Sequence, residues 1–118
     1  MMDWSAVEEQ TPIPGFHGKV LHTDSMSFVL WRIDAGASLP EHRHVHEQVI
    51  HMLDGTFEAT VDGRTETLHA GMVSAIPSNA LHSGRALTDC RILDAFSPVR
   101  EDYRHGLTSG VISGVSKG

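Results

Sequence analysis

The chain has 118 residues and a formal net charge of −6, with 15 acidic and 9 basic residues. It is long enough to fold as one domain without a disulfide, which its single cysteine could not form within the chain. No run of Lys or Arg could neutralise phosphates, so nucleic acid is excluded as a partner, and no apolar run reaches the ~20 residues needed to span a membrane. The N-terminus lacks the basic and apolar segments of a signal peptide, so we expect a cytoplasmic protein.

Short β-rich segments separated by Gly, Pro and Asp-Gly turns follow one another along the chain. The strands that we predict cover residues 26–33, 48–53, 56–61, 64–68, 72–76 and 90–96. Helical periodicity is weak, with at most one turn at residues 100–105. This pattern predicts an all-β single domain, a small antiparallel β-barrel or sandwich, over residues 1–105. Residues 106–118 are Gly/Ser-rich and are interpreted as a C-terminal tail, or as a strand that requires a partner chain.

Four side chains with period-two spacing are the first candidate for chemistry: His42, His44, His46 and Gln48. In an extended strand all four point to the same face, about 6.6–7 Å apart per two residues. Two imidazoles at this spacing can bind one metal ion with bonds of about 2.1 Å, but four cannot unless the strand bends sharply. Spacing alone therefore predicts two or three ligands here without selecting them, and a His-rich exposed loop explains an isolated His-x-His pair equally well.

Two longer patterns extend this segment. The first is G-x5-H-x-H-x3-Q-x6-G over residues 36–55, and the second is G-x5-P-x4-H over residues 71–82. Together they resemble the two motifs of the cupin superfamily, over about residues 20–100. The resemblance implies a small antiparallel β-barrel of the jelly-roll type with one divalent metal ion, which can be Zn, Ni, Fe or Mn. It also implies the ligands: His42, His44, Gln48 and His82.

Gln48 departs from the Glu that is usual at this cupin position. The neighbouring Glu47 could be a carboxylate ligand instead, but it points to the opposite face of an extended strand. A neutral Gln leaves the full charge of the ion in place. This favours a Lewis acid that binds anions over a redox iron centre, which commonly has a carboxylate ligand.

A second informative segment follows the last predicted strand. Asp94, Phe96 and Arg100 can place an acid, an aromatic ring and a cation at one pocket. Their spacing alone favours a plainer interpretation, with Phe96 in the core and an ordinary ion pair between Asp94 and Arg100. However, D-x-F-S-P-x-R-E-D over residues 94–102, together with H-R-H-V-H-E-Q over residues 42–48, resembles the KdgF-type cupins of pectin and alginate breakdown.

Those cupins convert 4,5-unsaturated monouronates to linear 5-keto-4-deoxyuronates, and a Gln metal ligand is usual among them. The resemblance implies that Asp94 and Arg100 are catalytic, and that Phe96, Arg100 and His46 contact the substrate. It therefore predicts a non-redox, isomerase-type enzyme with a small anionic sugar as substrate. Alternatives are a metal-dependent dioxygenase, a sugar or sugar-phosphate isomerase, and a non-enzymatic cupin that binds a sugar or small anion. By analogy with small cupins we expect a homodimer paired through an edge strand.

Overall fold

The computed structural model of the chain describes residues 1–107, and these form strands and two short 3-10 turns. The elements are η1 (Trp4–Ala6), β1 (Gln10–Ile13), β2 (Phe16–His22), β3 (Ser27–Ile33), β4 (Ser38–His42), β5 (Glu47–Asp54), β6 (Thr56–Val61), β7 (Arg64–His69), β8 (Val73–Ile76), β9 (His82–Ala86), β10 (Cys90–Ser97) and η2 (Glu101–Tyr103). No helix in this range is both long and apolar enough to cross a membrane. The predicted tail lies outside the described residues from residue 108 onward, while Leu107 is buried in the core.

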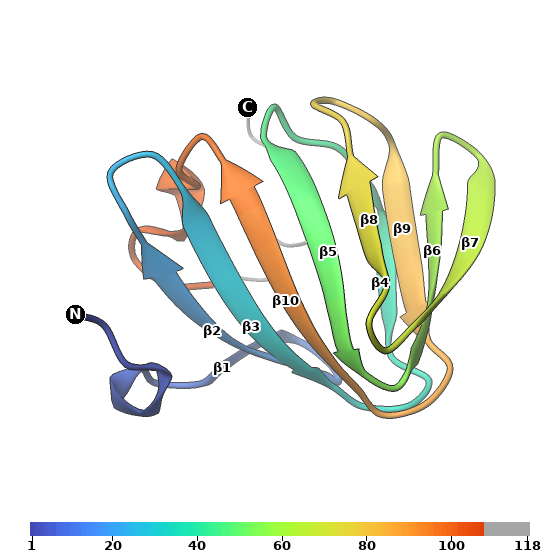
Figure 1. Cartoon of the computed structure of the whole chain (residues 1–118), viewed down its shortest axis with the longest axis horizontal. Helices are drawn as coiled ribbons and strands as arrows, with labels where there is room; N and C mark the ends of the chain where they lie inside the picture. Colours follow the sequence, from blue (N-terminus) through green and yellow to red (C-terminus); the bar gives the residue numbers. More distant parts are fainter. Residues whose placement is uncertain (108–118) are drawn as a thin grey trace.

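The strands form two antiparallel sheets that face each other (Figure 1). The larger sheet has the order β1-β2-β3-β10-β5-β8, and the smaller has the order β4-β9-β6-β7. Within residues 1–107 no hydrogen-bonded ladder joins the two sheets, so the predicted barrel is not closed. The segment between β3 and β4 carries the chain from the larger sheet to the smaller one, where it extends the β4–β9 pairing: Gly36 donates to the Ala86 carbonyl at 2.8 Å and Ala86 donates to the Ala37 carbonyl at 2.9 Å. The all-β class is confirmed.

The inner face of the larger sheet changes from apolar to polar along its strands. Cross-strand register places Trp31 opposite Ile92 and Ile92 opposite Met52 in one inward row. Two rows further along, Ser27 lies opposite Phe96, and Phe96 lies opposite Gln48. Side chains alternate between the two faces of a strand, so all of these residues point between the sheets. The apolar end fills the core, and the polar end leaves functional groups in a largely dry interior.

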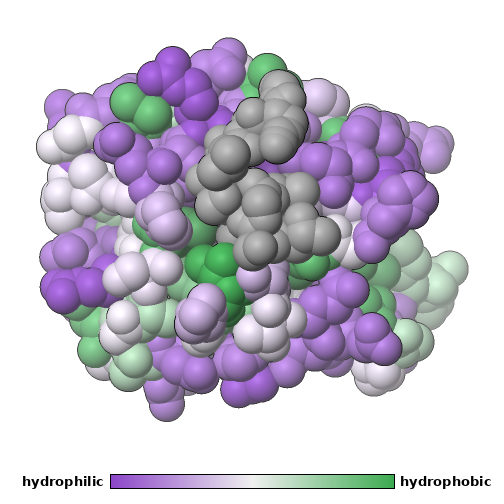
Figure 2. Space-filling view, turned by 180° about the vertical axis from the view of Figure 1, so that it is seen from behind, coloured by the Kyte–Doolittle hydropathy of each residue, from purple (hydrophilic) through white to green (hydrophobic). Residues whose placement is uncertain are grey.

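The outer surface is mostly hydrophilic on the face opposite to that of Figure 1. Figure 2 shows this face, with hydrophobic side chains grouped near its centre and hydrophilic ones around them.

Candidate active site

The histidine-rich segment is a bend between two strands and not one continuous strand. β4 ends at His42 and β5 begins at Glu47, with no strand structure between them. The bend is tied to the loop before β9, because the Asn79 N–H donates to the His44 carbonyl at 2.8 Å. Asn79 has a φ of 64°, a left-handed conformation that Asn tolerates better than most residues. This bend is what allows His42 and His44 to face the same point.

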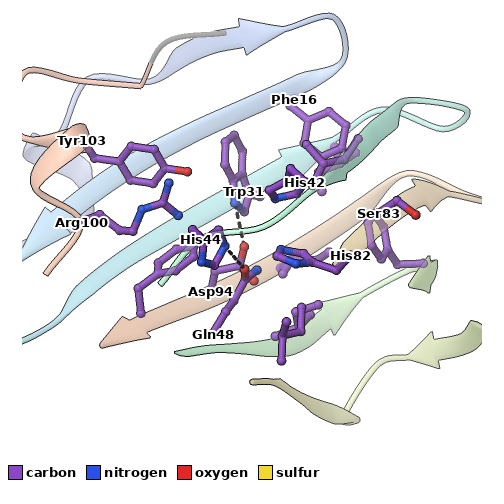
Figure 3. A pocket seen from close by; sticks show the side chains of 17 residues that line it. Phe16, Trp31, His42, His44, Gln48, His82, Ser83, Asp94, Arg100 and Tyr103 are labelled. Atoms are coloured by element: carbon purple, nitrogen blue, oxygen red, sulfur yellow. Dashed lines mark hydrogen bonds between the residues drawn. The ribbon is translucent and has the colours of Figure 1, made fainter. Parts of the chain in front are cut away.

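The third histidine comes from the neighbouring strand. His82 opens β9 and lies opposite His42 in the β4–β9 ladder. One ligand nitrogen from each of His42, His44 and His82 lies within 4.8 Å of the others. Gln48 adds an oxygen to the group, since its Oε1 lies 3.2 Å from His44 Nε2 (Figure 3). The structure therefore brings together all four predicted ligands, while Glu47 is exposed.

Backbone carbonyls hold the three rings in one orientation. Each ring has its Nδ1 within hydrogen-bond distance of a carbonyl two residues away in the chain, so Nδ1 carries the proton and donates. The distances are 2.8 Å from His42 to Pro40, 3.0 Å from His44 to His46, and 2.9 Å from His82 to Ala80. Each Nε2 is then a lone-pair donor, as metal-binding histidines require. His82 Nε2 is buried with no partner among the described residues, which fits a role as a metal ligand.

The protonation of these histidines also suits a metal. Burial lowers the pKa of His42 to about 4 and the pKa of His44 to about 3. Burial lowers the pKa of His82 as well. All three rings are therefore neutral at neutral pH, and the neutral form is the one that binds metals.

Asp94 lies on the inner face of β10, between the aromatic core and the metal ligands. Its Oδ2 accepts a hydrogen bond from Trp31 Nε1 at 3.1 Å, and its Oδ1 is buried with no partner in the described structure. Burial raises the pKa of Asp94 to about 7, although the neighbouring Gln48 amide, the hydrogen bond from Trp31 and the charge of Arg100 oppose this shift. A carboxyl group with one fixed and one free oxygen in a dry pocket is suited to proton transfer.

Arg100 is held by its own set of contacts. It is 2% exposed, and its guanidinium forms two hydrogen bonds with Asp102, at 3.0 Å from Nε and 2.8 Å from Nη2. The guanidinium carbon lies 3.9 Å from the centre of the Tyr103 ring and 4.8 Å from that of Phe96. No ion pair joins Asp94 and Arg100 in residues 1–107. The ion-pair interpretation that the spacing favoured is thus wrong, because Asp102 takes the guanidinium.

One pocket is lined by the candidate ligands and by the side chains around them: His42, His44, Gln48, His82, Trp31, Asp94, Phe96, Arg100 and Tyr103. His46 and Asp102 do not line it. Its empty volume is about 550 Å³, which includes space open to solvent. Phe96 packs edge-on against His44, with ring centres 5.7 Å apart. The centre of the His46 ring lies 5.5 Å from that of His44, but this predicted contact residue does not line the pocket. Sequence reasoning missed Trp31 and Tyr103 as pocket residues. The inward parity of Trp31 in a predicted strand was the only available signal.

Two facing antiparallel sheets with imidazoles converging in a pocket between them are typical of a cupin. The family described as "Cupin domain" matches residues 29–96, and the chain belongs to this family.

Among individual proteins, the chain is 27% identical over 104 residues to the pectin degradation protein KdgF of Dickeya dadantii (strain 3937), covering 82% of this chain and 94% of that protein. The structure of KdgF from Halomonas sp. matches with a TM-score of 0.77 and 32% identity, over 80% of this chain and 89% of that one. An RmlC-like cupin from Shewanella frigidimarina NCIMB 400 matches with a TM-score of 0.81 and 29% identity, over 86% and 93% of the two chains. A Bacillus subtilis oxalate decarboxylase, at 20% identity, shares the fold alone.

Proposed function

We propose that this protein is a metal-dependent enzyme of pectin breakdown that opens the ring of 4,5-unsaturated monouronates and releases linear 5-keto-4-deoxyuronates. The observation that carries the proposal is the unpartnered Oδ1 of Asp94 in the same pocket as the three histidines and Arg100. Similarity to two KdgF proteins over most of the chain supports it independently.

The metal would be held by Nε2 of His42, His44 and His82 and by Oε1 of Gln48. All four ligands are neutral, so when bound the ion supplies Lewis acidity toward an anionic oxygen with its charge undiminished. The preset Nδ1 bonds fix the tautomer of each ring and leave each Nε2 available to bind it.

Arg100 would bind the substrate carboxylate. Asp102 accepts hydrogen bonds from the Nε–H and from one N–H of Nη2. The remaining N–H groups of the guanidinium are left as donors for an anion. The stacked ring of Tyr103 and the adjacent ring of Phe96 hold the guanidinium plane. A fixed guanidinium loses little freedom when it binds a carboxylate, which favours binding.

Asp94 would move the proton. Its Oδ1 takes the proton of the anomeric hydroxyl, the bond between C1 and the ring oxygen breaks, and C1 becomes an aldehyde. The same proton is then delivered to C4, and C5 becomes a ketone. Atoms and electrons balance without an oxidant, so the reaction is an isomerisation. Trp31 holds Oδ2 throughout, which keeps Oδ1 turned toward the substrate.

The test is to mix metal-loaded protein with unsaturated galacturonate and follow the loss of ultraviolet absorbance from the conjugated C4=C5 bond. Wild-type protein should remove the absorbance without consuming oxygen. Asp94→Asn should abolish turnover and keep the metal, while His82→Ala should also lose metal. Asp24→Asn, which changes an exposed turn residue, is the matched control and should keep full activity.

Two results would contradict the proposal. The first is unchanged absorbance with wild-type protein whose metal content has been confirmed. The second is full activity of Asp94→Asn, which would remove Asp94 from the mechanism. Oxygen uptake with loss of a phenolic or thiol substrate would instead favour a dioxygenase.

A further inference from the structure

A buried serine lies behind Arg100, outside the pocket. Ser27 opens β3 and is fully buried, at 0% exposure. Its Oγ accepts a hydrogen bond from the backbone N–H of Arg100 at 2.8 Å and lies 2.7 Å from His22 Nδ1. While its oxygen accepts from Arg100, the serine hydroxyl can donate its proton to His22 Nδ1 in the tautomer that leaves this nitrogen unprotonated. The serine thus links the end of β2, the start of β3 and the segment after β10.

The sheet register explains why the serine meets this backbone group. Ser27 lies opposite His22 on one side and opposite Phe96 on the other. The chain leaves β10 just after Phe96 and turns back, which brings the Arg100 N–H onto the serine hydroxyl. Ser27 therefore fixes the backbone of Arg100, while Asp102 fixes its guanidinium.

We propose that Ser27 is a positioning residue that sets where Arg100 presents its guanidinium to a carboxylate ligand, with His22 orienting the serine hydroxyl. The kinetic consequence rests on the proposed function, whereas the effect on Arg100 itself does not. A substitution that removes the hydroxyl leaves a buried N–H without a partner, and this N–H must move to find one. Arg100 moves with it and loses its alignment with the ligand.

The first measurement observes Arg100 directly, by nuclear magnetic resonance of its side-chain Nε–H in metal-loaded protein, with the signal assigned by its absence in Arg100→Lys. In wild-type protein the signal should be sharp and slow to exchange. Ser27→Ala should speed exchange at both the side-chain and backbone N–H of Arg100 by about tenfold or more, because a buried hydrogen bond is lost. Ser27→Thr retains a hydroxyl and should restore the slow exchange.

The second measurement uses the uronate assay. Ser27→Ala should raise KM about tenfold, because the misaligned Arg100 guanidinium loses about one hydrogen bond to the substrate carboxylate. The kcat should change less than threefold. A general loss of folding would lower the amount of active protein and therefore kcat. Ser74→Ala is the matched control: it removes a serine hydroxyl that bonds only Glu66, at 3.5 Å, on another strand, and should change neither parameter.

Different results would contradict the positioning role of Ser27 and the proposed function. Unchanged exchange at Arg100 in Ser27→Ala overturns the positioning role, and so does an unchanged KM in an active enzyme. Altered exchange at Arg100, together with wild-type protein that does not convert the uronate, overturns the proposed function and retains the positioning role. If Ser27→Ala does not fold, His22→Gln tests the same link by removing only the second hydrogen bond, and it should speed Arg100 exchange less than tenfold but measurably.

Discussion

A glycine in β2 controls the position of Trp31, and this gives the sharpest test of how the core supports the site. A Cβ added at Gly18 would lie 2.6 Å from Cζ3 and 2.7 Å from Cε3 of Trp31, and 2.9 Å from Cδ1 of Leu107. Ordinary contacts begin at 3.4 Å, so in Gly18→Ala the indole must shift by several tenths of an ångström. Trp31 packs edge-on against Phe16, with ring centres 5.7 Å apart, so the ring has little room to move.

The cost of this shift can be worked out from its parts. Overpacking costs about 1–3 kcal/mol, and weakening the bond from Trp31 to Asp94 adds about 1 kcal/mol. Replacing a glycine whose backbone suits alanine returns about 0.4–1 kcal/mol. We therefore expect Gly18→Ala to lower the free energy of unfolding by about 2 kcal/mol, and the melting temperature by about 8 °C.

Thermal unfolding of the metal-free protein measures the loss of stability, and the indole N–H resonance of Trp31 reports its hydrogen bond to Asp94. Gly71→Ala is the control, because its φ of 91° strains any side chain while its Cβ would meet nothing within 4 Å. It should lower stability and leave the Trp31 resonance unchanged. A Gly18→Ala protein with wild-type melting temperature and an unshifted Trp31 resonance would refute the reasoning.

Three further changes probe the pocket. Trp31→Phe should lower kcat about tenfold at unchanged metal content, because Asp94 loses the donor that fixes its Oδ2; an unchanged kcat would argue against that orientation. Gln48→Glu should tighten metal binding in a titration and raise KM for the uronate, because a carboxylate cancels part of the ion's charge; a lower KM would contradict this. Asp102→Asn should raise KM more than it lowers kcat, because Arg100 loses its charged clamp; equal losses in both would assign Asp102 a different role.

The strands with strong alternation were predictable, and the strands that contain glycine were not. Residues 56–61 alternate between apolar and polar side chains next to an Asp-Gly turn, and β6 has those same bounds. β9 was missed because Ser83 and Gly84 erase its pattern. A Cβ at Gly84 would lie 2.3 Å from Cζ of Phe57, so this glycine makes room for a ring on the neighbouring strand. Gly18 has the same relation to Trp31, and β2 was missed as well. Contacts of this kind cannot be inferred from local sequence.

The residues of the site also differ in how far the sequence could predict them. The predicted metal ligands follow motifs with fixed spacing, so resemblance was enough to select His82, which the structure places beside His42 and His44. The partners that set the behaviour of Asp94 and Arg100 follow no spacing rule. Trp31 lies 63 residues from Asp94 in sequence, and Asp102 lies only two residues after Arg100, where an ordinary surface acid is equally expected. The pairing depends on how the turn after β10 buries the Arg100 side chain beside Asp102, which itself stays exposed.

If the protein acts on a uronate as proposed, the charges of the pocket would let it select an anion in spite of its net charge of −6. Long-range attraction is unfavourable, so the selection must be local. Three neutral imidazoles and the amide of Gln48 leave a bound divalent ion uncompensated, and Asp102 balances only the charge of Arg100. Asp94, with its pKa raised to about 7 by burial, is only partly ionised near neutral pH and so adds less than a full negative charge. In the proposed reaction the substrate carboxylate would then supply the negative charge that these ligands lack, which would account for a glutamine at the position where most cupins have a glutamate.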